Sequence, residues 1–289
     1  MKTTTMPPVL RVSVAWRHNG RKFLPSACVC RPANHQGIHT ASSGIYRTTG
    51  APYEVRDVLH SVVDADSFEE CKAQYEQSLV TATARVGGRS FALVANQRAS
   101  TKTGEGEVHI GGVIYGDAAD KAARFVLNAD QKQLPIVFFQ DVTGFMVGTR
   151  AEHGGIIKDG AKLVRAVSNC RVPKITVVMG NSYGAGNYAL CGRAFGPRFM
   201  VAWPTARIAV MGGAQAAQTI HSVQSARVVE GVDSGQSEEA LERIRASYEE
   251  TASPYYATAR LWVDAVIDPA ATRDVLDHLL AIVCRGEGA

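Results

Sequence analysis

The chain lacks several patterns that identify common classes of protein. No uninterrupted apolar stretch in its 289 residues approaches the roughly 20 that a membrane-spanning helix needs. No Gly-Lys-Ser/Thr follows a glycine-rich turn, and no Gly-x-Gly-x-x-Gly spacing is present, so neither kind of nucleotide-binding loop is indicated.

The cysteines and histidines lack the spacing of disulfide frameworks and metal sites. Cys28 and Cys30 are too close for a zinc knuckle, and the sequence has no second cysteine pair of matching spacing. His109, His221 and His278 are isolated from one another in the sequence. We therefore expect no metal site, reduced thiols and a cytoplasmic location. The six cysteines are Cys28, Cys30, Cys71, Cys170, Cys191 and Cys284.

Acidic residues are absent from residues 1–50, which carry seven Lys or Arg, while the other 239 residues carry 24 basic and 27 acidic ones. We expect this basic segment to be a poorly ordered leader and residues 51–289 to be the folded domain. A leader rich in Arg, Ser and Thr is also typical of mitochondrial transit peptides, which leaves a mitochondrial matrix location as the alternative. A third alternative is an aberrant leader. Without aromatic interleaving or a Gly-rich arginine run it does not indicate nucleic-acid or membrane binding.

The hydrophobic pattern after residue 53 predicts an α/β domain. We expect helices over 53–63, from 66–70 onward and over 117–130, and a hairpin of strands 80–85 and 90–96 joined by Gly87 and Gly88. Two strand–turn–helix units follow, with strands over 134–140 and 172–179 and helices over 155–169 and from 185 to about 193. Short strands over 199–203 and 207–211, a helix from about 212, and a helix over 237–260 interrupted near Pro254 complete the pattern. Repeated units of this kind predict stacked parallel strands.

Glycine-rich turns follow both strands of the repeated units. The first glycine turn covers residues 144–148 and the second covers residues 184–186. Because ligands gather at the carboxyl ends of parallel strands, we expect the two turns to lie side by side there. Free backbone N–H groups at a helix start suit a carbonyl, carboxylate, phosphate or developing oxyanion. The alternative is a strand-to-helix turn without chemistry.

Side chains that could act as catalysts are few. Glu152 and His153 follow the first glycine turn as an acid–base pair or, more simply, as a polar helix start. We do not expect Ser182 to be a hydrolase nucleophile, and Cys170 and Cys191 lie in apolar surroundings typical of a core. Any chemistry is therefore expected from backbone dipoles more than from a catalytic triad.

Several ordered motifs resemble the carboxyltransferase (beta) subunit of biotin-dependent acyl-CoA carboxylases, nearest the methylcrotonoyl-CoA type. They lie at residues 117–126, 140–148, 155–163, 182–188 and 202–213, and the resemblance covers residues 51–285. Their number and order make the likeness specific. It implies a crotonase-like fold of ββα turns, and carboxyl transfer between biotin and the enolate carbon of an acyl-CoA.

The resemblance also implies roles for named residues. The backbone N–H groups of Ala185 and Gly186 match an oxyanion hole for the biotin ureido oxygen, and the first glycine turn matches the wall over which biotin lies. The residues implied to bind biotin are Gly144, Phe145, Met146, Val147, Gly148, Tyr183 and Gly184. Asn187 and Tyr188 match the acyl pocket, where acetyl- and propionyl-type enzymes have Tyr-Asp. The loop 98–110 is more similar to members of less settled substrate, including decarboxylases.

One departure from the family pattern concerns completeness. The family subunit consists of two crotonase-like halves, and this chain resembles only the second. We therefore expect an oligomer in which another chain supplies the N-terminal half. The sequence has no Ala-Met-Lys-Met biotinylation site and no ATP-binding motif, so biotin would arrive on a biotin carboxyl carrier protein or a biotin carboxylase subunit. The alternatives are a subunit of a biotin-dependent decarboxylase and a non-catalytic assembly subunit.

Overall fold

One twisted sheet forms the centre of the computed structural model, which describes residues 51–104, 106–213, 215–216, 218–219 and 234–284. The strand order is β1-β2-β3-β7-β9-β10-β12, with β11 added beside β9. The pairs β1–β2 and β2–β3 are antiparallel, and all other pairs of this sheet are parallel. The strands are β1 (Glu69–Glu70), β2 (Leu79–Val86), β3 (Arg89–Asn96), β7 (Ile136–Val142), β9 (Lys174–Tyr183), β10 (Phe199–Ala202), β11 (Arg207–Ala209) and β12 (Ala265–Val266).

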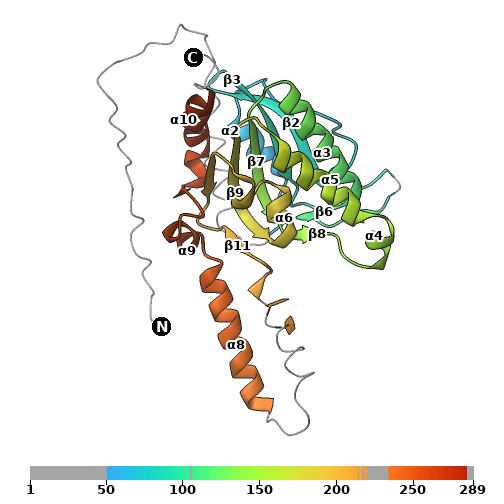
Figure 1. Cartoon of the computed structure of the whole chain (residues 1–289), viewed down its shortest axis with the longest axis vertical. Coiled ribbons are helices and arrows are strands. Elements are labelled where there is room, and N and C mark those ends of the chain that lie inside the picture. The colour runs from blue at the N-terminus through green and yellow to red at the C-terminus, as the bar shows by residue number, and fades with distance from the viewer. Residues whose placement is uncertain (1–50, 105, 214, 217, 220–233, 285–289) are drawn as a thin grey trace, which may run out of the picture.

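Helices cover both faces of this sheet (Figure 1). Two small strand pairs lie beside it, β4 (Thr101–Lys102) with β5 (Val108–His109) and β6 (Val113–Ile114) with β8 (Gly144–Phe145). The architecture confirms the predicted α/β class. The helices are α2 (Val55–Val62), α3 (Gly116–Gln131), α4 (Thr149–His153), α5 (Ile156–Asn169), α6 (Gly184–Ala189), α8 (Ser234–Thr251), α9 (Pro254–Ala259) and α10 (Thr272–Val283), with 3-10 turns η1 (Arg193–Phe195) and η2 (Pro269–Ala271).

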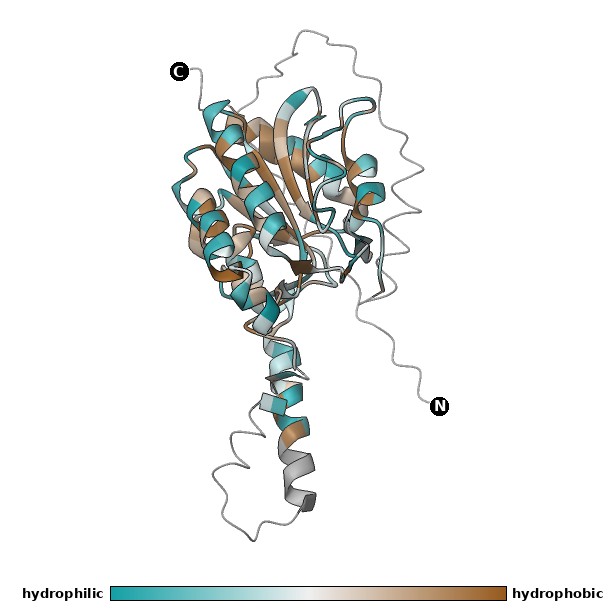
Figure 2. Ribbon diagram, turned by 90° about the vertical axis from the view of Figure 1, so that its right-hand side faces the viewer, coloured by the Kyte–Doolittle hydropathy of each residue, from teal (hydrophilic) through white to brown (hydrophobic). Residues whose placement is uncertain are grey.

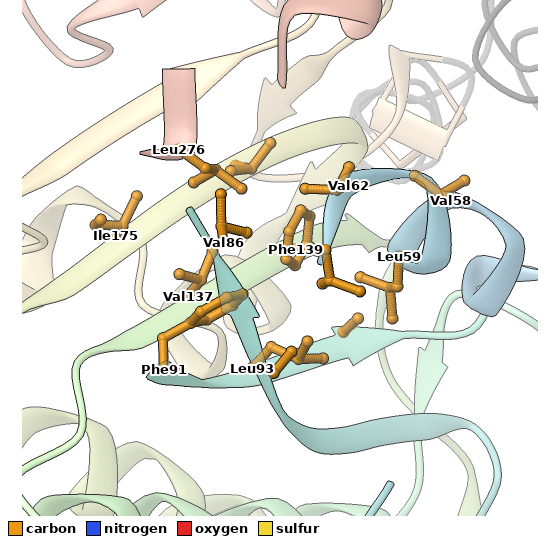
Figure 3. Close-up of a cluster of buried hydrophobic side chains, with 14 of the residues drawn as sticks. Val58, Leu59, Val62, Val86, Phe91, Leu93, Val137, Phe139, Ile175 and Leu276 are labelled. Carbon is orange, nitrogen blue, oxygen red and sulfur yellow. The ribbon is translucent and has the colours of Figure 1, made fainter. Parts of the chain in front are cut away.

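The sheet separates two apolar cores. Alternate residues of a strand point to opposite faces, so Phe139 packs with α2 and α10 while Phe138 packs with α3 and α5. Figure 3 shows the first of these cores, where Leu59 of α2 and Leu276 of α10 meet the strand residues. Every residue of β7 is buried, which explains why its sequence reads as an apolar run. Polar residues cover the outer faces of the helices (Figure 2).

Three predicted elements differ from those observed. The helix expected from residues 66–70 is wrong, because Glu69 and Glu70 form strand β1 against β2 and Glu70 is held by the Arg56 guanidinium at 2.8 Å. Strand β9 extends four residues beyond the predicted end, because β11 pairs with its residues 181–183. The following helix ends at Ala189 instead of about 193, where Cys191 takes a positive φ of 62°. The interruption expected near Pro254 is confirmed, since helices α8 and α9 lie on either side of residues 252–253.

Two predictions fall wholly or largely outside the described residues. The predicted leader, residues 1–50, lies there, as does most of the helix expected from about residue 212. Helix α8 extends away from the sheet (Figure 1). Among the helices of the described residues, none combines the length and apolar character needed to cross a bilayer.

Candidate functional site

The two glycine turns lie at one end of the central sheet, as predicted. Strands β7 and β9 are parallel neighbours, with Phe139 opposite Val177 and Val142 opposite Ser182. The first glycine turn follows β7 and the second follows β9 directly. Figure 1 shows β8 and α6 close together at this end. Adjacent parallel strands therefore deliver both turns to the same edge.

Gly186 is required by the close approach of the two turns. A Cβ at this position would lie 2.6 Å from Val142 Cγ2 and 3.3 Å from Gly144 Cα. Gly184 has a φ of +48°, a conformation that favours glycine, and its Cβ would lie 2.9 Å from the Val210 carbonyl oxygen. A larger residue at Gly186 would push the turns apart, so this glycine sets the distance between them, whereas Gly184 allows the close approach of Val210.

Helix α6 presents backbone donors at this junction. Its first turn contains Ala185, which is exposed, and Gly186, which is buried. The N–H groups of a first helical turn have no partner within the helix, and the helix dipole places positive potential there. No side chain of the described residues caps this end. Within the described residues, the N–H groups of this first turn thus have no side-chain acceptor.

The first glycine turn divides into an anchored part and an open part. The Met146 N–H donates to the Ile114 carbonyl at 2.9 Å, and the Phe145 ring packs inward against α5 at Gly160. Val147 is 77% exposed. Gly144 and Gly148 have φ of +148° and +109°, and a Cβ on either would meet no atom within 4 Å. The open part therefore borders free space beside the α6 donors.

A network of hydrogen bonds between side chains supports the second glycine turn. Asn187 Nδ2 donates to Ser182 Oγ at 2.7 Å, and this hydroxyl donates to Gln140 Oε1 at 2.6 Å. Gln140 Nε2 in turn donates to the Leu190 carbonyl beyond α6 at 2.6 Å. Ser182 is fully buried, in agreement with the expectation that it is no nucleophile. This hydrogen-bond network connects β7, β9 and α6.

Asp141 forms a second support, which the sequence interpretation missed. Its side chain is buried, and Oδ1 accepts the Asn181 N–H at 2.8 Å while Oδ2 accepts the Tyr53 hydroxyl at 3.1 Å. Arg98 Nε lies 3.7 Å from the same oxygen. Burial, followed by the Asp141 charge, raises the pKa of Tyr53 well above its ordinary value, so this tyrosine stays a donor. A polar residue at the end of an otherwise apolar strand was the available signal.

The two predicted acyl-pocket residues point in different directions. The Asn187 amide is committed to Ser182 in the interior, whereas Tyr188 is 48% exposed and meets Phe195 edge-on. Tyr183, which precedes α6, is half-buried, and burial raises its pKa. The structure thus brings Asn187 into the support of the turn and leaves Tyr188 at the surface.

Other chemically interesting side chains lie outside this junction. Glu152 and His153 belong to the short helix α4, none of whose residues is buried. Cys170 and Cys191 are buried core residues, as expected, and burial raises their pKa values to about 11 and about 12. Within the described residues, no group of three or more potential ligands could hold a metal ion.

A family model and individual known proteins both indicate the same family. The family model described as "Carboxyl transferase domain" matches residues 17–285, a range that begins inside the predicted leader. The biotin-dependent 3-methylcrotonyl-coenzyme A carboxylase beta1 subunit of Mycobacterium tuberculosis is 47% identical over 234 residues, which are 80% of this chain and 42% of that protein. The chain thus spans about two fifths of the length of such a relative.

Two solved structures extend the comparison to the fold. The beta subunit of geranyl-CoA carboxylase from P. aeruginosa has a TM-score of 0.72 and 38% identity, covering 82% of this chain and 43% of that one. The transcarboxylase 12S subunit, solved as a hexamer with methylmalonyl-coenzyme A bound, has a TM-score of 0.71 and 39% identity, covering 81% and 42%. These neighbours have the crotonase-like fold, which confirms the predicted fold class. The chain belongs to the carboxyl transferase domain family.

Proposed function

We propose that this chain is the biotin-side half of an acyl-CoA carboxyltransferase. The observation that carries the proposal is the contact between the two glycine turns, where Gly186 lies against Gly144 beside an uncapped helix start. Family membership gives this junction its chemistry, since a carbonyl oxygen that gains negative charge needs fixed donors. Biotin, carried by another chain, would supply the carboxyl group.

Ala185 and Gly186 are proposed to hold the ureido oxygen of biotin through their N–H groups. The α6 dipole adds to these two donors, and the contact of Gly186 with Val142 keeps the helix start in place. Donors fixed before the reaction need no reorganisation when charge develops, and one such donor contributes about 100- to 1000-fold in rate.

The first glycine turn is proposed as the wall beside biotin. Val147 offers an exposed apolar surface, and Gly144 and Gly148 leave the adjoining space free. Phe145 and Met146 contribute differently, by fixing the wall to α5 and β6. Tyr183 and Gly184 join the wall to the donors as the last residue of β9 and the first of α6.

Part of the acyl-CoA site is proposed to lie outside this chain. The matched part of this chain covers only 42% of the relative named above, and the transcarboxylase neighbour is a hexamer. We infer that another chain supplies the acyl-CoA half and that this chain contributes Tyr188, which is exposed on α6. Asn187 would act on that pocket through the position of the turn, because its amide is occupied by Ser182.

An assay of the intact assembly tests this proposal. The full-length chain, tagged and isolated from its source cells with the subunits that it holds, is supplied with free biotin and a labelled carboxylated acyl-CoA, either methylmalonyl-CoA or carboxylated 3-methylcrotonyl-CoA. We expect the assembly to release the label in a biotin-dependent way and the purified chain alone to release none. Release that continues without added biotin after avidin has blocked the biotin of the partner subunit, or full turnover by the chain alone, would contradict the proposal.

A further inference from the structure

We propose that Asp141 is a positioning residue for carboxyl transfer, because its carboxylate fixes the ends of β7 and β9 from which the two glycine turns start. The inference rests on the proposed function, since it assigns a role at the same junction. It differs from the donor role of Ala185 and Gly186, which act on an oxygen directly.

The pairing of β7 with β9 is interrupted at Asp141. Gln140 pairs with Val178 and Val142 pairs with Ser182, so one residue of β7 faces three of β9. In this gap the Asn181 N–H donates to Asp141 Oδ1 instead of a carbonyl of the neighbouring strand. The carboxylate therefore replaces a missing ladder bond directly before the second glycine turn.

The strand beside the Asp141 carboxylate leaves no room for a side chain at Gly180. A Cβ on Gly180 would lie 2.5 Å from Asp141 Cγ, so only glycine allows the carboxylate to press against β9. The main chain of Asp141 is fixed as well. Its N–H donates to Asn96 Oδ1 at 2.8 Å, and the Asn96 amide donates to the Asp141 carbonyl. Asp141 is thus held through both its backbone and its side chain.

The negative charge of Asp141 is balanced by its neighbours. A buried carboxylate is costly unless it is paired, and here Arg98 and the Tyr53 hydroxyl meet its outer oxygen. A Cβ on Gly112 would lie 2.4 Å from Arg98 Nη1, and the Gly112 carbonyl accepts both the N–H and the hydroxyl of Thr143, the residue before the first glycine turn. The carboxylate and its cation therefore connect the supports of both turns. Pairing also keeps an unbalanced negative charge away from an oxygen that becomes anionic at α6.

The test compares Asp141→Asn with a matched variant, Asp64→Asn. Asp64 is also a buried aspartate that pairs with an arginine and accepts backbone N–H groups, but at the other end of the sheet. Both variants are measured in the assembly for kcat, for KM of free biotin and for KM of the acyl-CoA, together with the melting temperature. The asparagine keeps an acceptor for Asn181 but leaves Arg98 without its countercharge.

We expect Asp141→Asn to lower kcat/KM for biotin by about 100-fold, since misplacement by about 1 Å can cost that much, with KM for the acyl-CoA changed by less than about twofold. Asp64→Asn should lower the melting temperature at least as much and leave kcat and both KM values near wild type. Equal activity of the two variants would overturn the inference. An inactive wild-type assembly would instead contradict the proposed function.

If Asp141→Asn does not fold, Tyr53→Phe decides the question. This change removes one hydrogen bond from the carboxylate and preserves the ring. It should lower kcat/KM for biotin by about threefold to tenfold, because a lost hydrogen bond to a charged group weakens the fixation without removing it. Wild-type kinetics in Tyr53→Phe would then overturn the inference.

Discussion

A buried aspartate holds each end of the central sheet, and the two ends differ in whether their backbone donors are occupied. At one end Asp64 accepts the N–H groups of Gly87 and Gly88 and pairs with Arg273. At the other end Asp141 accepts the Asn181 N–H and pairs with Arg98. A buried aspartate with an arginine partner thus secures a strand end in both places.

The surroundings of the glycines distinguish the two ends. A Cβ on Gly87 would lie 2.0 Å from Asp277 Oδ1 of α10, and although Gly87 and Gly88 are exposed, their N–H groups are occupied by the Asp64 carboxylate. Gly144 and Gly148 instead border free space, next to the uncapped start of α6. The donors of the Asp64 end are thus used within the fold, whereas those at the start of α6, at the open end, have no side-chain cap among the described residues. The state of the backbone donors, more than residue type, marks the candidate site.

The largest expected effect is loss of transfer at the open end in Gly186→Ala. The added methyl group would lie 2.6 Å from Val142 Cγ2, which forces the two turns apart. Removal of one oxyanion donor from its position predicts a fall in kcat of about 100- to 1000-fold in the assembly assay. Gly104→Ala is the control, since a Cβ there meets no atom within 4 Å and should leave kcat unchanged. Equal kcat in both variants would contradict the assigned role of Gly186.

Asp64→Ala should produce the opposite pattern at the other end of the sheet. Removing one partner leaves Arg273 without its countercharge and two N–H groups without their acceptor. We expect the free energy of unfolding to fall by about 3–5 kcal/mol in urea titrations. Transfer per folded molecule should match wild type at a temperature where both are folded. A large loss of kcat would remove the distinction between the two ends.

The acid dependence of stability sharpens the same comparison. Burial raises the pKa of Asp64, but hydrogen bonds from Arg273, Gly88 and Gly87 outweigh it, so the folded-state pKa lies below its ordinary value of 3.8. The unfolded chain therefore binds this proton first, and the contribution of Asp64 is present above pH 3.8 and is lost as the pH falls through the folded-state pKa. Unfolding titrations should show a smaller difference between wild type and Asp64→Ala at pH 3 than at pH 6. A constant difference would contradict this assignment.

Fold class and the position of the two glycine turns could be predicted from the sequence because both depend on local patterns. The apolar run of β7 and the glycines after it identify a strand end without knowledge of its partners. The ends of β9 and α6 depend on contacts that are distant in sequence. Pairing with β11 prolongs β9, and the backbone conformation of Cys191 ends the helix early. Asp141 was missed for the same reason, since Tyr53, 88 residues away, became its partner only through folding.

The smallest expected effect concerns the surface of the proposed wall. Val147→Ser removes an exposed apolar side chain, so the free energy of unfolding should change by less than about 0.5 kcal/mol. We expect KM for free biotin to rise by about twofold to fivefold, because only part of one apolar contact is lost. Ile282→Ser on α10, at the opposite face of the sheet, is the control and should leave KM unchanged. Equal KM values would exclude Val147 from the wall.

The most direct measurement of the central claim follows the backbone amides of the full-length chain, labelled with ¹⁵N at alanine and glycine, during addition of free biotin. The account predicts that the Ala185 and Gly186 resonances move with the biotin concentration, because these two N–H groups receive the ureido oxygen. Gly87 and Gly88, whose N–H groups already donate to Asp64, should stay in place. Stationary Ala185 and Gly186 resonances at saturating biotin would contradict the claim.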